Sequence, residues 1–295
     1  MRGRARRALP ELRRRAARPA DPHRRGARPP PRRHRASVPR VIPRILIIAG
    51  SDSGGGAGIQ ADIRTVTMLG AHPMTAVTAI TAQNTRGVDA VMPVPPEMIV
   101  AQIDAVAGDI GVDAVKIGMI GSAEAADAVA ARLAGMAVPV ILDPVMVATS
   151  GARLADAATV AALSRLMTLA TVVTPNLPEL AALGGEAAVL SHGCLLAAKG
   201  GHGEGDMIID RLIGPDGEIV RVEAPRIDTR HSHGTGCTFA AALATGLGAG
   251  MGPKDAFARA VAFVRAALAA APGLGHGHGP VGHALGVVPF DLVGR

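Results

Sequence analysis

The sequence predicts an α/β protein built on one mostly parallel sheet. From Arg44 onward, short runs rich in β-branched residues alternate with alanine-rich segments of helical length, and the strand-like runs are apolar on both faces. Such strands are typical of parallel sheets that are covered by helices on both sides. With 295 residues, 48% of them hydrophobic, the chain can bury a substantial core, which must be mainly aliphatic because there are four Phe and no Trp or Tyr.

The expected strands are short apolar runs bounded by turn residues. They are Ile45–Ala49, Thr75–Ala82, Ala114–Ile117, Val138–Asp143, Val172–Thr174, Leu195–Lys199 and Met207–Leu212, with Glu218–Pro225 completing a hairpin over Pro215-Asp216-Gly217. The expected helices are Ile59–Leu69, Pro96–Gly108, Ala123–Ala134, Asp156–Leu169, Leu177–Leu183, Cys237–Leu247 and Lys254–Ala271. About seven parallel units without an intervening linker predict a single domain over residues 41–290.

Residues 1–40 differ sharply in composition from the rest of the chain. They contain fifteen Arg against Glu11 and Asp21, which leaves sixteen basic and twenty-two acidic residues in 41–295. The formal net charge of +7 therefore comes from this segment. Rich in Arg and Pro and poor in periodic apolar residues, it is predicted to be disordered. An arm for nucleic acid or an anionic surface, a targeting segment and a dispensable extension are all open interpretations. The acidic remainder makes nucleic acid an unexpected partner.

The uncharged stretch Gly234–Pro253 has the length of a membrane span. It is interrupted by Gly246, Gly248, Gly250 and Gly252, which favours a buried core helix over a membrane helix. The two cysteines, Cys194 and Cys237, give no disulfide framework and indicate a reducing compartment. We therefore expect a cytoplasmic protein without a membrane partner.

A glycine-rich loop, Gly50 to Gly58, follows the first expected strand and precedes a helix. Backbone amides of such loops can cradle phosphates. The loop matches neither standard nucleotide motif, because Ile59-Gln60 stands where a Walker loop has Lys-Ser/Thr, and Gln83 stands where a dinucleotide fold has an acidic residue. We interpret it as a ligand-contacting loop.

A second glycine turn, His233-Gly234-Thr235-Gly236-Cys237, opens the expected helix at Cys237. Its glycines permit a tight turn that exposes consecutive amide groups at a helix N-terminus, which is a natural anion site. Cys237 would lie where a thiol ionises easily. A purely structural helix start is the alternative interpretation.

Two further polar residues stand at the ends of expected strands. Gln83 offers both a donor and an acceptor, which matches a heterocycle with an amino group beside a ring nitrogen. Lys199 is one of only three lysines beside twenty-eight arginines, and it precedes glycines that would admit a phosphate. For Lys116, a structural ion pair and a ligand contact are equally open.

Carboxylates for a metal come from Asp143 and Glu179, and Asn176 lies three residues before Glu179 on the same face of a helix opening. This sparse supply fits Mg²⁺, which takes one or two protein carboxylates together with substrate phosphates. Helix capping is the alternative.

The Gly/His-rich segment Gly273–Gly286 contains His276, His278 and His283, but with no acidic ligand nearby it is predicted to be a flexible, solvated tail.

Together these motifs resemble the hydroxymethylpyrimidine/phosphomethylpyrimidine kinase family of thiamine biosynthesis, within the ribokinase-like superfamily. The likeness runs in order over residues 44–283. It is carried by Gly50-Ser51-Asp52 with Gly54–Asp62, Gln83–Gly87, Lys116–Met119, Asp143–Met146, Thr174–Glu179, Lys199–His202 and His233–Cys237. The resemblance implies a ribokinase-like fold, ATP and Mg²⁺, a homodimer, and phosphorylation of 4-amino-5-hydroxymethyl-2-methylpyrimidine and then of its monophosphate.

The resemblance also implies roles for individual residues. The residues it implies for binding the pyrimidine are Gln83, Gly50, Asp52, Ala57 and Met119. Those for the nucleotide phosphates are Lys199 and Asn176, and those for Mg²⁺ are Asp143 and Glu179. The anion hole would be formed by Gly234, Thr235, Gly236 and Cys237. Most sugar kinases of the superfamily carry Asp at the position of Cys237. Whether this thiol acts as a general base or only shapes the hole is open.

One departure from the family is the segment Gly184–Ala198, which is about fifteen residues shorter than usual before the lysine strand. The family's helix there normally covers one face of the sheet, so its loss is expected to expose apolar surface. A pyridoxal-type kinase on the same scaffold and a non-catalytic pyrimidine-binding relative are the alternative functions.

Overall fold

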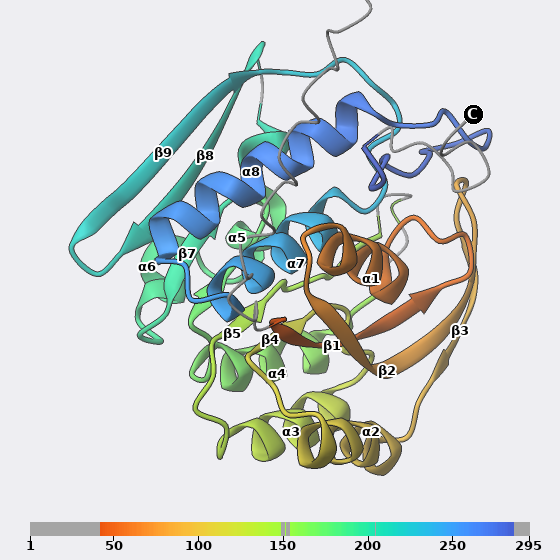
Figure 1. The fold of residues 1–295 in the computed structure, drawn as a ribbon, viewed down its shortest axis with the longest axis vertical. Helices are drawn as coiled ribbons and strands as arrows, with labels where there is room; N and C mark the ends of the chain where they lie inside the picture. Colours follow the sequence, from red (N-terminus) through yellow and green to blue (C-terminus); the bar gives the residue numbers. More distant parts are fainter. Residues whose placement is uncertain (1–41, 149–150, 152–153, 204, 286–295) are drawn as a thin grey trace, which may run out of the picture. The chain divides into compact units, whose positions relative to one another are not determined.

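The computed structural model describes residues 42–148, 151, 154–203 and 205–285. The predictions for residues 1–40 and for 286–290 therefore lie outside the described residues. The described residues contain a nine-stranded sheet in the order β3-β2-β1-β4-β5-β6-β7-β8-β9, with helices on both faces (Figure 1). This is the predicted α/β architecture with a mostly parallel sheet.

Six neighbouring strands run parallel and form the centre of the sheet. They are β2 (His72–Gln83), β1 (Arg44–Asp52), β4 (Ala114–Ile117), β5 (Val140–Leu142), β6 (Val172–Val173) and β7 (Leu195–Ala198). The antiparallel strands β3 (Val88–Pro93), β8 (Met207–Gly214) and β9 (Gly217–Pro225) form the two edges. The predicted hairpin is present, whereas β3 was not predicted because it is largely exposed and lacks the apolar pattern of a buried strand.

Helices cover the two faces in separate layers. One layer contains α1 (Gly58–Met68), α7 (Thr235–Gly248) and α8 (Pro253–Ala269), and the other contains α2 (Pro96–Asp109), α3 (Ala123–Leu133), α4 (Ala157–Met167), α5 (Leu177–Ala182) and α6 (Glu186–Leu190). Because successive strand residues point to opposite faces, Ile45 and Ile47 enter the first layer while Leu46 and Ile48 enter the second. Strand β1 is therefore buried on both sides, as the sequence predicts.

Helix α7 is the best-buried helix, and every residue from Thr238 to Leu247 is buried. Small residues permit this close packing: a Cβ atom at Gly246 would lie 2.9 Å from Ala256 Cβ, and one at Gly248 would lie 2.7 Å from Ile45 Cδ1. The prediction of a buried core helix at Gly234–Pro253 is thus confirmed. In the described part of the chain, each helix is too short or too polar to cross a bilayer.

The loop predicted at Gly273–Gly286 is present, and residues 273–276 are exposed as expected, but residues 277–285 are not a flexible, solvated tail. The segment folds back: His278 N donates to Thr85 O (2.8 Å), Gly279 O accepts from His233 N (3.1 Å), and His283 is only 4% exposed. Its glycines permit close backbone contact, since a Cβ atom at Gly277 would lie 2.0 Å from Thr85 O. The segment therefore connects the end of β2 to the turn that precedes α7.

The short segment Gly184–Ala198 does not leave the sheet bare. It forms α6, and Val189, Cys194 and Leu196 are at most 2% exposed. The Cys194 thiol donates to Val189 O at 3.3 Å. One turn of helix is therefore enough to cover this end of the face, and the expected apolar exposure is not found at these positions.

Candidate active site

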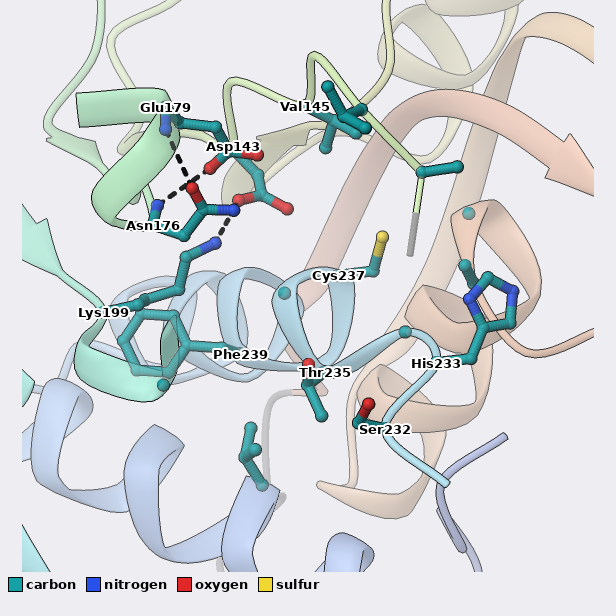
Figure 2. Close-up of a pocket in the computed structure, with 18 of the residues that line it drawn as sticks. Asp143, Val145, Asn176, Glu179, Lys199, Ser232, His233, Thr235, Cys237 and Phe239 are labelled. Atoms are coloured by element: carbon teal, nitrogen blue, oxygen red, sulfur yellow. Dashed lines mark hydrogen bonds and ion pairs between the residues drawn. The ribbon is translucent and has the colours of Figure 1, made fainter. Parts of the chain in front are cut away.

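The carboxyl ends of the parallel strands meet at one edge of the sheet, where a cavity of about 790 Å³ opens. All thirteen predicted site residues line it: Gly50, Asp52, Ala57, Gln83, Met119, Asp143, Asn176, Glu179, Lys199, Gly234, Thr235, Gly236 and Cys237. Figure 2 shows Asp143, Asn176, Glu179 and Lys199 gathered at one end, with Cys237 between them and His233. The tertiary structure thus assembles residues from most of the length of the chain.

Asp52, at the end of β1, organises the first glycine loop. Its Oδ1 accepts from Gly54 N (2.8 Å), and its Oδ2 accepts from Gly56 N (3.0 Å) and Ala57 N (2.9 Å). Burial opposes ionisation of this carboxyl, but His233 and the loop amides outweigh it and lower the pKa of Asp52. The Asp52 oxygens thus fix the shape of the loop, and the predicted contact of Asp52 with substrate stays a prediction.

The turn before α7 packs directly against that loop. Gly234, the N-cap of α7, has a φ of 88°, and a Cβ atom there would lie 1.9 Å from Gly56 O. Both the left-handed backbone and the contact require glycine. Residues Thr235 to Cys237 form the first helical turn, whose amide groups lack partners within the helix and favour an anion.

Lys199 follows β7 and forms an ion pair with Asp143, which follows β5. The distance from Nζ to Oδ1 is 2.7 Å, and Thr174 Oγ1 donates to the same oxygen at 2.9 Å. Burial opposes charge on both groups, yet their attraction lowers the pKa of Asp143 and raises that of Lys199. A Cβ atom at Gly236 would lie 3.3 Å from Lys199 Nζ, so this ammonium faces the first turn of α7.

The first glycine after Lys199 has a structural purpose. A Cβ atom at Gly200 would lie 2.1 Å from Ile209 O, so glycine is needed for the contact with β8. The contact with β8 therefore explains the glycine at position 200, whether or not a phosphate binds beside it.

Asn176 and Glu179 form a capping box at the start of α5. Asn176 Oδ1 accepts from Glu179 N, and Glu179 Oε2 accepts from Asn176 N, both at 2.8 Å. The helix-capping interpretation is confirmed for both residues. Burial and the neighbouring Asp143 raise the pKa of Glu179 to about 7, although Lys199 opposes this shift.

Asp143 and Glu179 also fit the donor set of a magnesium site. The two carboxylates lie beside the cavity, and the charge of Asp143 contributes to the raised pKa of Glu179. A divalent cation between them would reduce this repulsion. Among the described residues no cluster of three or more His, Cys, Asp or Glu side chains could hold a metal by itself.

Cys237 differs from the expectation of an easily ionised thiol. Burial raises the pKa of Cys237 to about 11, even though Lys116 and the amide of Gly58 favour the thiolate. Lys116 and this amide therefore do not compensate for the loss of solvent. At neutral pH the side chain is a thiol.

The opposite end of the cavity contains Gln83 at the end of β2 and Met119 after β4. A Cβ atom at Gly50 would lie 2.3 Å from Met119 Cε, so glycine makes room for this side chain. Gln83 lies within hydrogen-bonding distance of Thr81 Oγ1 (3.1 Å) and His233 Nε2 (3.4 Å). The end with Gln83 is thus polar on one side and lined by a thioether on the other.

Sequence reasoning gave no role to several lining residues. His233 is 6% exposed, and its Nε2 lies 3.0 Å from Asp52 Oδ2. Arg226 donates to the carbonyl groups of Gly201, Gly203 and Gly205, and so holds the loop that follows Lys199. Phe239, Val261 and Leu268 form an apolar wall from α7 and α8. Of these residues only His233 belongs to a motif, and that motif gives it no role, because only the packing of distant elements brings it beside Asp52.

Of the two interpretations of Lys116, the structure shows the structural ion pair. Its Nζ lies 2.7 Å from Asp62 Oδ2 on α1, and both side chains are completely buried.

Comparison with known proteins identifies the family of this chain. The family model described as phosphomethylpyrimidine kinase matches residues 52–282. The hydroxymethylpyrimidine/phosphomethylpyrimidine kinase of Streptomyces coelicolor is 47% identical over 83% of this chain and 96% of its own length. The enzyme of the same name from Rhizobium meliloti is 47% identical over 81% of this chain and 96% of its own length.

Solved structures show the same architecture. An ADP complex of Bacillus subtilis pyridoxal kinase has a TM-score of 0.76 and 32% identity, covering 83% of this chain and 98% of that chain. A Clostridium difficile phosphomethylpyrimidine kinase has a TM-score of 0.65 and 33% identity, covering 76% of this chain and 98% of that chain. The fold and the site therefore define a phosphotransferase of the ribokinase-like class. Within that class, the chain belongs to the phosphomethylpyrimidine kinase family.

Proposed function

We propose that this protein uses ATP to phosphorylate 4-amino-5-hydroxymethyl-2-methylpyrimidine and then the resulting monophosphate, in thiamine diphosphate biosynthesis. The observation that carries the proposal is a single cavity with Gln83 at one end, Lys199 at the other and the N-terminus of α7 between them. An amide suits an aminopyrimidine, and an ammonium with helix amides suits phosphates. Relatives that are 47% identical carry this activity in their names.

The chemistry needs positioning and charge neutralisation. The hydroxymethyl oxygen attacks the γ-phosphorus, the bond to the β–γ bridging oxygen breaks, ADP leaves, and the hydroxyl proton passes to solvent or to a phosphate oxygen. The amides of Gly236 and Cys237 and the Lys199 ammonium would stabilise the charge on the transferring group. In the second round the phosphate of the monophosphate is the nucleophile, and the diphosphate forms.

We further propose that Asp143 and Glu179 hold Mg²⁺, directly or through water. When bound, the ion would neutralise phosphate charge. In that state Lys199 would exchange part of its interaction with Asp143 for a phosphate oxygen, which its 15% exposed side chain can reach from the cavity wall.

The proposal is tested by measuring ADP formation by the full chain with the hydroxymethyl pyrimidine, with its monophosphate and with pyridoxal. We expect the highest kcat/KM with the two pyrimidines. A preference for pyridoxal would favour the alternative that the pyridoxal kinase structures suggest. Binding of the pyrimidine without ADP formation would favour a non-catalytic relative.

We also propose a homodimer in the cytoplasm. The family resemblance supports the dimer, and two free cysteines support a reducing compartment. Light scattering of the purified protein tests the first, and localisation of the tagged full chain tests the second.

A further inference from the structure

Four side chains form a chain of polar contacts at the Gln83 end of the cavity. Asp52 Oδ2 lies 3.0 Å from His233 Nε2, and His233 Nε2 lies 3.4 Å from Gln83 Nε2. Gln83 Oε1 lies 3.1 Å from Thr81 Oγ1, which lies 2.9 Å from Ser51 O. Asp52, His233 and Thr81 are all at most 6% exposed, so protein groups must satisfy one another here.

The position of the proton on His233 follows from Asp52. Asp52 Oδ2 already accepts from two loop amides, and its carboxyl is ionised, so it can only accept. His233 Nε2 must therefore carry a hydrogen and donate it, whether the ring is neutral or charged. Any group on the same side of Nε2 also faces a donor.

This fixes the orientation of the Gln83 amide. An amide can exchange its oxygen and nitrogen by a half-turn, and the choice is made by its hydrogen bonds. With Nε2 of Gln83 toward His233, as the contacts above have it, two donors face each other. A half-turn of the amide puts Oε1 toward His233, and the one hydrogen on His233 Nε2 is then shared between Asp52 and Gln83 Oε1.

The Thr81 side gives the same answer. A hydroxyl has one hydrogen, and the nearer acceptor for Thr81 is Ser51 O, at 2.9 Å against 3.1 Å for Gln83. Thr81 Oγ1 then offers a lone pair to Gln83, which Nε2 of Gln83 can use. Both neighbours thus require oxygen on the His233 side and nitrogen on the Thr81 side.

We infer that His233 and Thr81 are positioning residues that lock the Gln83 amide in this orientation and so set substrate specificity. A ring binds with its exocyclic amino group toward the His233 side and its ring-nitrogen acceptor toward the Thr81 side. A 4-oxo pyrimidine, the deaminated form, presents an acceptor and an N–H in the reverse order, and it is rejected because Gln83 cannot turn. The substrate statement rests on the proposed function, whereas the orientation of the amide does not.

The orientation is tested on the substrate-free protein by ¹⁵N NMR of histidine side chains, with the His233 signal assigned by its loss in His233→Gln. We expect a hydrogen on Nε2 of His233. A ring protonated only on Nδ1 would overturn the inference, because Nε2 would then accept from the amide of Gln83. This readout does not depend on any kinase activity.

Specificity is tested with Thr81→Val, which removes the lone pair at nearly constant shape, and with Thr81→Ser, which retains it. For Thr81→Val we expect KM for the 4-amino pyrimidine to rise about tenfold, in line with one lost hydrogen bond, and kcat to change less than twofold. Its preference for the 4-amino over the 4-oxo pyrimidine, as a ratio of kcat/KM, should fall by a similar factor. Thr81→Ser should restore both values.

An unchanged preference in Thr81→Val, in a protein whose melting temperature matches the wild type, would overturn the specificity role. If the wild-type protein phosphorylates neither pyrimidine, the proposed function fails, and the NMR measurement still decides the orientation of the amide.

Discussion

Lys116 Nζ lies 2.7 Å from Asp62 Oδ2 in the core, and neither side chain has any exposed surface. The pair connects β4 to α1 behind the cavity. Burial opposes the charge on Lys116, but Asp62 and the more distant Asp143 outweigh it and raise its pKa. Asp62 Oδ1 is buried and has no hydrogen-bond partner among the described residues, so the carboxylate depends mainly on Lys116.

Replacing one partner of this ion pair should lower the free energy of unfolding more than replacing both partners. Lys116→Met leaves the Asp62 carboxylate buried and unpaired, and we expect a loss of about 3–5 kcal/mol in the free energy of unfolding. The double substitution Asp62→Leu with Lys116→Met removes both charges and should recover most of that loss. Urea unfolding followed by circular dichroism measures both. A double variant no more stable than Lys116→Met would contradict the interpretation.

Gly234→Ala should damage both the fold and the site. The new Cβ would be strained at a φ of 88° and would collide with Gly56 O, so we expect a loss of at least about 2 kcal/mol together with most kinase activity. Gly250→Ala is the matched control, because its φ is 81° but nothing lies within 4 Å of its Cβ position. It should cost about 1 kcal/mol and leave kcat intact. Equal effects of the two substitutions would mean that the contact with Gly56 is unimportant.

Cys237→Ala should reduce kcat less than tenfold. An effective general base contributes roughly 10²–10⁴-fold and has a pKa near the working pH. Burial raises the pKa of Cys237 to about 11, so the thiol is protonated and can only shape the anion hole. Steady-state kinetics of Cys237→Ala and Cys237→Asp at saturating ATP measure this. A hundredfold loss in Cys237→Ala, restored by Asp, would instead identify a base.

His283 should make the fold sensitive to acid. Its Nε2 lies 2.9 Å from Thr238 Oγ1, which donates to Gly234 O, and burial with a smaller effect of Arg64 lowers the pKa of His283 to about 4. Between pH of about 6.5 and 4 the unfolded chain binds a proton that native His283 does not. The free energy of unfolding therefore falls as the pH is lowered through this range, by up to about 3 kcal/mol from this group.

Urea unfolding at several pH values between 7.5 and 4.5 tests this. We expect a shallower pH dependence in His283→Gln, whose amide keeps a donor toward Thr238. His72→Gln, at an exposed position, is the control and should retain the wild-type dependence. Parallel curves for His283→Gln and the wild type would contradict the assignment.

Much of the site could be predicted from the sequence because chemistry-bearing residues follow strands. Asp143, Lys199 and Gln83 end strands of a parallel sheet, and such ends share one edge. The glycine turn at Gly234 was visible as a local motif. These inferences need only the order of elements and the parallel direction of the strands.

Other features depended on contacts between distant segments. The pairing of Asn176 with Glu179 is local, but the Lys199 ion pair with Asp143 spans 56 residues, and His233 meets Asp52 across 181. The segment from residue 277 was misinterpreted for the same reason: its glycines resemble those of a solvated loop, but Gly277 lies against Thr85. Composition cannot show which surface a glycine approaches.

The second glycine turn illustrates the division between sequence and structure. The sequence alone determined that residues 233–237 form a tight turn at a helix start, because two glycines and the helical run behind them are local properties. Only the tertiary structure decided that Gly234 closes against Gly56, that Lys199 faces the same turn, and that the Cys237 thiol stays protonated. Burial and long-range electrostatics set those properties, and both arise only when the sheet is assembled.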